Sequence, residues 1–510
     1  MTDVLIGQSY FLRFDPKLWR AMQPYPPLGS LYACSYLRRE GYEVALFDAM
    51  LAPGEAAWDE ALARERPQFA VLFEDNFNYL SKMCLLHMRE AAFQMIAMAR
   101  NRGCTVIAAG SDATDHPELY LAQGADFVIA GEGEITLGEL LRTLSAGRRA
   151  DVGEIPGLVF RDKACGEVVR TRPRPDLRDL DTLPFPAWDL VDVERYRAIW
   201  LTRHGHYSMN MVTTRGCPFH CNWCAKPIWG QRYNSRSPEN VVEELAFLAR
   251  TYRPDHIWFA DDIMGLKPRW LERFADLMEE RRLRVPFKSL HRADLLVRGN
   301  TVEALSRAGA KTVWMGAESG SQRILDAMEK GTTVEQIREA TRLLHRAGIE
   351  VGYFLQFGYP GENRADIERT IRLVRECRPD DIGISVSYPL PGTRFHQAVA
   401  AELQTRSNWT DSADLAMLYR GPFSTYFYRQ LHTVVHRDFR ARRAWRLLRA
   451  AAARPRSIRP AHAALAARMT VNWVLLPVER ARLEHRARTS RFGRHGAAAE
   501  PSGRPVAQPE

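Results

Sequence analysis

The chain has 510 residues, 46% of them hydrophobic, which excludes both a single small core and a disordered protein. Its net charge of +10 is unevenly placed: residues 431–510 hold 17 Arg, no Lys and five acidic residues, a net charge of +12, and residues 1–430 sum to −2. The basicity therefore belongs to the tail, and we expect no nucleic-acid partner.

The first 145 residues alternate short apolar runs with helix-like segments. Five strands are expected at 4–7, 43–47, 69–73, 105–109 and 127–130, and helices at 28–40, 55–64, 82–102, 117–122 and 135–145. This alternation predicts an α/β domain with a parallel sheet and helices on both faces. Ligands of such domains lie beyond the carboxyl ends of the strands.

Residues 146–204 are rich in proline and predict a small hairpin followed by a linker. From 205 to 397 the alternation resumes. The six expected strands are 210–214, 256–260, 287–290, 312–316, 350–356 and 382–387. Six strand–helix units predict a partial (β/α)6 barrel whose strand ends converge on one mouth.

After residue 397 the pattern loosens. We expect a helical region over 398–490 and a disordered tail over 491–510, where large apolar residues become scarce. The Arg-rich region allows weak contact with a membrane surface, although a solvated helix pair explains it as well. The apolar stretch 471–478 is far below the ~20 residues that span a bilayer.

Eight cysteines, scattered apart from one group of three, do not resemble a disulfide framework. The start of the chain enters a strand-like run without a basic region or cleavage site, so no secretion is expected. Both observations predict a reducing cytoplasm.

The group of three is Cys217, Cys221 and Cys224, within the run 214–224, directly after the first predicted barrel strand. Thiolates hold iron–sulfur clusters, and a 4Fe-4S cluster takes four ligands. Three cysteines leave one iron for a small molecule. The alternative is zinc with His220 as a fourth ligand, but structural zinc sites usually pair two separated knuckles.

The flanking motifs strengthen the first interpretation. They are Tyr25-Pro26-Pro27-Leu28-Gly29, Gly131-Glu132-Gly133-Glu134, Phe259-Ala260-Asp261-Asp262 and Met315-Gly316-Ala317-Glu318-Ser319-Gly320. In this order and spacing, the chain resembles the cobalamin-binding radical S-adenosylmethionine (SAM) enzymes, the group of the anaerobic magnesium-protoporphyrin monomethyl ester cyclases and radical C-methyltransferases. The resemblance covers about residues 1–400.

The resemblance implies a flavodoxin-like (Rossmann-like) cobalamin-binding domain over 1–145 and a radical SAM barrel over 205–397. The three cysteines would hold the 4Fe-4S cluster, and SAM would complete its coordination. Asp261 and Asp262 would accept from the SAM ammonium group, or else cap a helix. Arg292 would pair with the SAM carboxylate, or else form a surface ion pair. Glu318 and Ser319 would hold the ribose or cap a turn.

Trp223 would lie near the adenine, or serve only as core. The cobalamin residues implied by the resemblance are Tyr25, Pro26, Pro27, Leu28 and Gly29 along the corrin, and Gly110, Ser111, Gly131, Glu132, Gly133 and Glu134 toward the nucleotide tail. The Asp-x-His-x-x-Gly signature of many cobalamin domains is missing, which leaves open a domain that is retained without the cofactor.

The function implied is a C-methyltransferase that passes a methyl group, by way of methylcobalamin, to an unactivated carbon of a specialised metabolite or lipid. Its partners would be a small-molecule substrate and a reductant such as flavodoxin or ferredoxin. Two alternatives stay open: a radical oxidative cyclase or rearrangement enzyme, and a non-catalytic iron–sulfur or cobalamin sensor.

Overall fold

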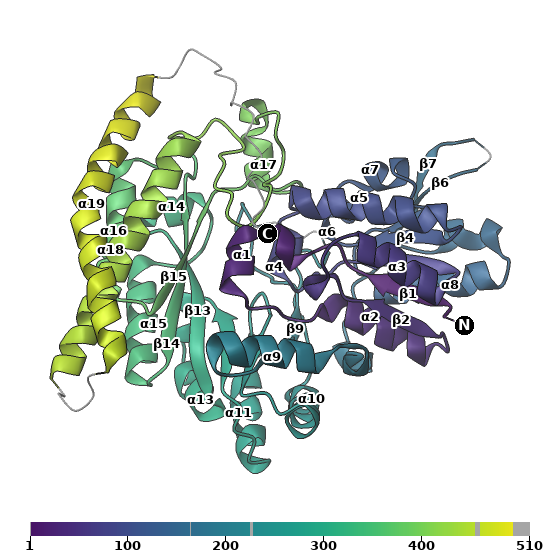
Figure 1. Ribbon diagram of the computed structural model, residues 1–510, viewed down its shortest axis with the longest axis horizontal. Helices are drawn as coiled ribbons and strands as arrows, with labels where there is room; N and C mark the ends of the chain where they lie inside the picture. Colours follow the sequence, from purple (N-terminus) through teal and green to yellow (C-terminus); the bar gives the residue numbers. More distant parts are fainter. Residues whose placement is uncertain (1, 164, 225–227, 454–458, 493–510) are drawn as a thin grey trace. The chain divides into compact units, whose positions relative to one another are not determined.

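The computed structural model describes residues 2–163, 165–224, 228–453 and 459–492, and the chain divides into two compact units after Tyr419. The first unit contains two main β-sheets, and the second contains two long helices (Figure 1). The predicted domain boundaries at 145, 204 and 397 all fall inside the first unit and stay predictions.

The first sheet is the predicted flavodoxin-like sheet. Its parallel strands lie in the order β2-β1-β3-β4-β5, with a topological switch point between β1 and β3. Their bounds are β1 Val4–Gly7, β2 Val44–Phe47, β3 Phe69–Phe73, β4 Thr105–Ala109 and β5 Phe127–Ile129. The predicted hairpin also forms, as β6 Leu158–Arg161 and β7 Val168–Arg170, but it extends this sheet as two antiparallel strands beside β5.

Helices cover both faces of the first sheet. On one face α2 (Leu28–Arg39) packs with α8 (Glu134–Ser145). On the other face α3 (Ala56–Glu65) packs with α5 (Leu86–Asn101) around the fully buried Trp58. The shorter helices are η1 Leu12–Phe14, α1 Pro16–Ala21, η2 Ala49–Leu51, α4 Tyr79–Lys82, α6 Ser111–Asp115, α7 Pro117–Ala122 and η3 Arg149–Glu154.

The second sheet confirms the partial barrel. Six parallel strands lie in the order β15-β14-β13-β12-β11-β8, one beside the next along the chain (Figure 1). They are β8 Ser208–Met211, β11 His256–Phe259, β12 Phe287–His291, β13 Ala310–Glu318, β14 Glu350–Phe357 and β15 Asp381–Val386.

Amphipathic helices follow the barrel strands and cover the outer face. They are α10 Pro238–Thr251, α11 Trp270–Glu280, α13 Thr301–Ala308, α15 Val334–Arg346 and α16 Arg364–Cys377. The connecting helices are η4 Leu180–Thr182, η5 Trp188–Leu190, α9 Val193–His204, α12 Ala293–Leu296, α14 Gln322–Ala327, α17 Arg394–Ala398 and η6 Ala400–Glu402.

A two-stranded ribbon closes the base of the cysteine loop. It consists of β9 (Thr214–Arg215) paired antiparallel with β10 (Asn234–Ser235). Gly216 follows β9 with a φ of 78°, and a Cβ there would lie 2.5 Å from the Arg232 carbonyl oxygen. Only glycine therefore lets the chain turn from the ribbon into the loop.

The second unit is a helical pair, α18 (Thr425–Ala452) and α19 (Pro460–Phe492). The helices run antiparallel, because later positions of α18 contact earlier positions of α19: Tyr426 contacts Arg486, Gln430 contacts Glu479 and Arg437 contacts Asn472. Residues 491 and 492 still belong to α19, and the rest of the predicted disordered tail, 493–510, lies outside the described residues. No helix in the described ranges is long and apolar enough to cross a membrane.

Arg215 joins the two sheets of the first unit. It lies on β9, is 4% exposed, and donates to Glu132 (2.5 Å) and to both carboxylate oxygens of Glu134 (2.7 and 3.1 Å). Glu132 lies in the turn between β5 and α8, and Glu134 is the first residue of α8; burial raises the pKa of Glu132. A buried cation with two buried anions thus fixes the first sheet against the base of the cysteine loop.

A second set of buried carboxylates ties together the loops at the carboxyl ends of the first sheet. Glu74 follows β3 and accepts from the backbone N–H of Ser9 after β1 (2.9 Å). Asp75 accepts from the N–H of Gly29 at the start of α2 (3.0 Å). Burial raises the pKa of Glu74 to about 7 and that of Asp75 to about 6.

Arg215→Met should destabilise the first unit by about 3–5 kcal/mol, since it leaves two buried carboxylates without their cation. The measurement is denaturant unfolding followed by tryptophan fluorescence. The control is Arg38→Gln, which breaks the Arg38–Asp189 pair, whose side chains are 37% and 64% exposed; a loss below about 1 kcal/mol is expected there. Equal losses of stability in the two variants would contradict the role given to Arg215 with Glu132 and Glu134.

Glu74→Gln should be more stable than the natural protein near neutral pH, by roughly 1–3 kcal/mol. The folded protein holds the Glu74 proton up to a pKa of about 7, while the unfolded chain releases it from about 4.5. As the pH rises through that window, the natural protein therefore loses the stability that the protonated carboxyl contributes. The Glu74→Gln variant keeps this stability, because glutamine does not titrate. Thermal unfolding between about pH 4 and pH 8 tests the difference, which should vanish at the acidic end. The exposed Glu90→Gln should show no such trend.

Candidate functional site

The cysteine loop lies at the barrel mouth, directly after the first barrel strand, as predicted. Cys221 is buried, and Cys217 and Cys224 are half-buried. The Arg292 Nη1 lies 3.7 Å from the Cys221 Sγ, and the guanidinium lies 3.6 Å from the centre of the Phe219 ring. Nearby cations stabilise thiolates, the form of cysteine that binds metal. Within the described ranges, no three His, Cys, Asp or Glu side chains are already gathered as a metal site.

Asn222 fastens the cysteine loop to the opposite side of the barrel. Its Nδ2 donates to the Ala327 carbonyl (2.8 Å), and its Oδ1 accepts from the Tyr359 hydroxyl (2.8 Å). Its backbone N–H donates to Met328, and its carbonyl accepts from the N–H of Phe395 (3.1 and 2.9 Å). Four hydrogen bonds from the residue between Cys221 and Trp223 hold the loop in place.

The two aspartates that end β11 have different partners. Asp261 is 1% exposed, and its carboxylate accepts from Thr213 N, Thr213 Oγ1 and Thr214 N at 2.7–2.8 Å. Burial raises its pKa to about 6. Asp262 forms an ion pair with Lys82 of α4 (2.6 Å). Asp261 therefore positions the start of the cysteine loop, and Asp262 contacts the first sheet's domain; contact of either with SAM stays a prediction.

Arg292 and Glu318 lie near the cysteine loop, and Lys330 connects them. The Lys330 Nζ pairs with Glu318 (2.8 Å), and the Lys330 carbonyl accepts from Arg292 Nη2 (2.6 Å). Arg292 also donates to Asp294 (2.9 Å). Lys330 lies 5.9 Å from the centre of the Trp223 ring, whose indole N–H has no partner in the described part of the chain. These side chains form one charged group at the mouth.

Ser319 is fully buried and lies apart from that group. Its hydroxyl shares a hydrogen bond with Thr370 (3.2 Å) and accepts from the N–H of Ser321 (3.1 Å). This is the turn-capping arrangement that the sequence left open as the alternative to ribose binding.

The residues expected along the corrin meet the barrel. Tyr25 lies between Trp200 and Trp258, with ring centres 5.1 and 4.8 Å away, and its hydroxyl hydrogen-bonds Ser208 (3.0 Å). The Pro26 carbonyl accepts from Asn210 Nδ2 (2.9 Å). Pro27 precedes α2, and Leu28 is fully buried. This segment therefore joins the first sheet's domain to β8 and β11.

At three of the glycines expected to give the cofactor room, other parts of the protein fill the space beside the glycine. A Cβ on Gly29 would lie 3.0 Å from the Glu74 carbonyl oxygen, and one on Gly110 would lie 2.6 Å from the Glu74 side chain. A Cβ on Gly133 would lie 2.7 Å from the Phe73 ring. Internal packing accounts for all three, and close approach of a ligand at these positions stays a prediction.

The polar residues expected near the nucleotide tail also have protein partners. Both carboxylates of the run 131–134 bind Arg215, and Glu132 accepts in addition from the N–H of Leu177 (2.7 Å). The N–H of Gly131 donates to Thr114, and the Ser111 hydroxyl lies 3.4 Å from Asn76 Oδ1. The structure thus gives Glu132 and Glu134 a clamping role that the sequence did not indicate.

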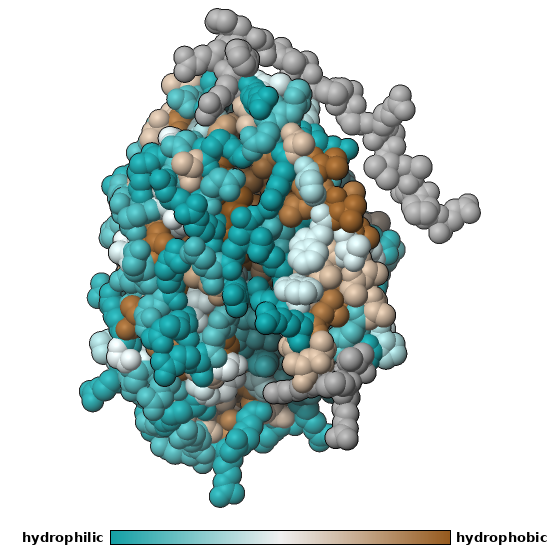
Figure 2. Space-filling model, turned by 90° about the vertical axis from the view of Figure 1, so that its left-hand side faces the viewer, coloured by the Kyte–Doolittle hydropathy of each residue, from teal (hydrophilic) through white to brown (hydrophobic). Residues whose placement is uncertain are grey.

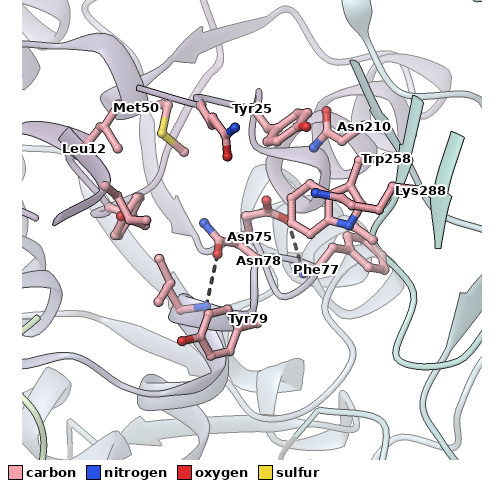
Figure 3. A pocket seen from close by; sticks show the side chains of 15 residues that line it. Leu12, Tyr25, Met50, Asp75, Phe77, Asn78, Tyr79, Asn210, Trp258 and Lys288 are labelled. Atoms are coloured by element: carbon pink, nitrogen blue, oxygen red, sulfur yellow. Dashed lines mark hydrogen bonds between the residues drawn. The ribbon is translucent and has the colours of Figure 1, made fainter. Parts of the chain in front are cut away.

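A cavity of about 200 Å³ lies where the first sheet's domain faces the inner side of the barrel (Figure 3). The first domain contributes residues from the loops after β1 and β3, and the barrel contributes residues of β8, β11 and β12. The lining residues are Tyr10, Leu12, Leu18, Gln23, Tyr25, Met50, Asp75, Phe77, Asn78, Tyr79, Leu80, Asn210, Trp258, Ala260 and Lys288.

The barrel side of this cavity carries polar groups without protein partners. In the described chain, the Trp258 indole N–H and the Asn210 Oδ1 are buried and make no hydrogen bond. Lys288 lies beside them with its ammonium 4.6 Å from the Trp258 ring centre, and burial lowers its pKa to about 8. Buried polar atoms are normally hydrogen-bonded, so this wall is prepared for a bound molecule.

Four residues of this region were missed by the sequence analysis: Arg215, Asn222, Lys288 and Lys330. Arg215 and Asn222 lie inside the cysteine run, but their roles depend on contacts with residues that are distant in the sequence. Lys288 had one available signal, because it is the one charged residue of the predicted strand 287–290 and directly follows Phe287, so it points to the opposite face. Lys330 had none.

Two family models match the chain. The model of the radical SAM superfamily covers residues 211–374, and that of the B12 binding domain covers residues 20–141. An uncharacterized methyltransferase of Pyrococcus horikoshii is 28% identical over 75% of this chain and 81% of its own length. The hopanoid C-3 methylase of Methylococcus capsulatus is 27% identical (74% and 70%), and the anaerobic magnesium-protoporphyrin IX monomethyl ester cyclase of Rubrivivax gelatinosus is 26% identical (74% and 67%).

The fold has solved counterparts. The radical SAM methyltransferase TsrM from Kitasatospora setae, with cobalamin and a [4Fe-4S] cluster bound, superimposes with a TM-score of 0.62 at 21% identity, covering 79% of this chain and 75% of that one. The cofactors that go with the two matched domains are SAM, a 4Fe-4S cluster and cobalamin. With both domains, the cysteine loop and the cavity between them present in one unit, the chain belongs to the cobalamin-binding radical SAM enzymes.

Proposed function

We propose that the protein is a C-methyltransferase that uses SAM, a 4Fe-4S cluster and cobalamin to methylate an unactivated carbon of a small molecule. One observation carries the proposal: the cavity in which Tyr25 and Asp75 of the cobalamin domain face Asn210, Trp258 and Lys288 of the barrel. A substrate there would contact both domains at once. When bound, the cluster with SAM supplies a radical that abstracts hydrogen, and cobalamin supplies the methyl group.

Cys217, Cys221 and Cys224 would hold the cluster. The donor set suits it, because thiolates are the ligands of iron–sulfur clusters. Arg292 and Lys330 place positive charge near Cys221, which offsets the negative charge of bound thiolates. Asn222 keeps the loop at the mouth of the barrel, where these thiolates would hold the cluster.

SAM would lie beside the charged group at the mouth. Arg292 suits its carboxylate, and Trp223, with an unpartnered indole N–H, suits its adenine. Glu318 adopts a left-handed backbone with φ 53°, which turns the strand end toward Lys330. Asp261, Asp262 and Ser319 would support this site through the contacts they already make.

Cobalamin would lie against the loops at the carboxyl ends of the first sheet, along the segment 25–29. Glu74 and Asp75 brace these loops with buried hydrogen bonds, so the surface is formed before a ligand arrives. Runs 110–111 and 131–134 border the same edge of the sheet. Tyr25 packs between Trp200 and Trp258, so aromatic rings form part of the wall beside this segment.

We also propose a cytoplasmic location and an electron donor such as flavodoxin or ferredoxin. The three thiols need a reducing compartment, and the cluster needs one electron for each SAM that it cleaves. No particular donor surface is assigned.

Replacing Cys221 with Ala should remove the visible absorbance of the anaerobically reconstituted cluster and the formation of 5′-deoxyadenosine. Cys165→Ser is the matched control, since Cys165 is exposed and outside the motif. Retained 5′-deoxyadenosine formation in the Cys221 variant would show that the cluster lies elsewhere.

Methyl transfer predicts two products from SAM: 5′-deoxyadenosine and S-adenosylhomocysteine, in equal amounts. Incubation with SAM carrying a deuterated methyl group should also place the label in a small-molecule product, detected by its mass. 5′-Deoxyadenosine without S-adenosylhomocysteine would favour a cyclase or rearrangement enzyme. Neither product, from protein that holds both cofactors, would favour a sensor.

Asn222→Ala should loosen the cysteine loop. It removes two side-chain hydrogen bonds, each contributing about 1 kcal/mol, so opening of the loop should become about 5- to 30-fold more frequent. The readout is the rate at which a chelator removes iron from the reconstituted protein. Asn300→Ala, at an exposed position without a capping contact, is the control and should leave the rate unchanged.

A further inference from the structure

The helical pair of the second unit has an apolar face on each side of α19. On the inner side, Leu476, Leu483 and Ala487 are buried at helical spacing. On the outer side, Val471, Val474, Leu475 and Val478 are 55%, 67%, 37% and 49% exposed. An exposed stripe of this kind is unusual on a helix whose other face already packs against a neighbour.

The stripe is longer than these four residues. Positions 463, 464, 467, 471, 474, 475, 478 and 481 lie within about 60° of one direction around the helix and hold only Ala, Val and Leu. From position 463 to 481 the stripe runs about 27 Å along the axis. Arg482 and His485 end it. Figure 2 shows brown and pale brown groups running along the right-hand side of the view.

Two tryptophans lie together on the same pair of helices. Trp445 of α18 and Trp473 of α19 have ring centres 5.9 Å apart and are 48% and 43% exposed. Trp473 lies about 140° around α19 from the centre of the stripe, so this pair belongs to the contact between the two helices and not to the stripe.

The charged residues of the helical pair are mostly positive. The residues of α18 and α19 include 13 Arg, no Lys and three acidic residues. Asp438 is already bound by Arg442 and Arg480, and Glu479 by Arg482. On α19 itself the exposed Arg468, Arg482 and Arg488 border the stripe, about 40–80° around the helix from its centre.

We propose that the outer face of α19 docks on the surface of a membrane containing anionic phospholipid. The apolar stripe would enter the boundary of the acyl chains, and the arginines would bind lipid phosphates. The charge selects this occupant, because a second copy of the chain would bring the same bordering arginines to this face. The helix would lie in the plane of the surface, consistent with the absence of a spanning helix in the described residues.

The test is flotation of the full-length protein with phospholipid vesicles. Vesicles containing about a third phosphatidylglycerol should bind the protein at low salt, and vesicles of phosphatidylcholine alone should bind it far less. High salt should weaken binding, because it screens the charges. Equal binding to both vesicle types, or to neither, would overturn the proposal.

Two sets of variants separate docking from misfolding. Val474→Asp with Val478→Asp should lower binding at least about tenfold, while Leu201→Asp, at a 46% exposed leucine of α9, should not. Arg468→Gln and Arg488→Gln leave the apolar face intact, and each should lower binding to anionic vesicles by about fivefold. Unchanged binding in both sets would overturn the proposal. So would a dimer, measured by light scattering, that the valine variants dissociate.

Discussion

The structure of the first unit depends on one buried ion triad. Arg215 at the base of the cysteine loop is held by Glu132 and Glu134 of the other sheet's domain, with the rings of Tyr32 and Phe77 about it at 5.7 and 5.6 Å. Apolar contacts alone allow two domains to slide, whereas a buried cation with two fixed anions has one low-energy register. This contact fixes the position of the cysteine loop relative to the first sheet's domain.

Other buried polar contacts also hold together segments that are far apart in the sequence. Asp261 holds the chain just before the loop, Asn222 holds its middle to the far side of the barrel, and Glu74 and Asp75 brace the opposite wall. Each is a directional contact between segments far apart in sequence. Radical chemistry needs such fixed geometry, because a reactive species must meet its intended partner before any other.

The sequence predicted the elements well and the side-chain partners poorly. All five parallel strands of the first sheet and all six barrel strands were found, since strand–helix periodicity is a local property. The hairpin of β6 and β7 was also found, but its place at the edge of the first sheet was not. Glu132, Glu134, Gly110 and Gly133 were interpreted as cofactor contacts, and the structure shows them engaged with Arg215, Glu74 and Phe73.

By itself, the sequence determined the two α/β domains, the cysteine loop and the family, because these depend on residue types at short, fixed spacings. Tertiary structure alone decided that Arg215 pairs with glutamates 81 and 83 residues away, and that Lys288, Trp258 and Asn210 share one cavity. It also decided that α19 has an apolar face turned outward. The physical reason is the same in each case: burial and pairing depend on which segments meet in space, and periodicity along the chain carries no record of the partner.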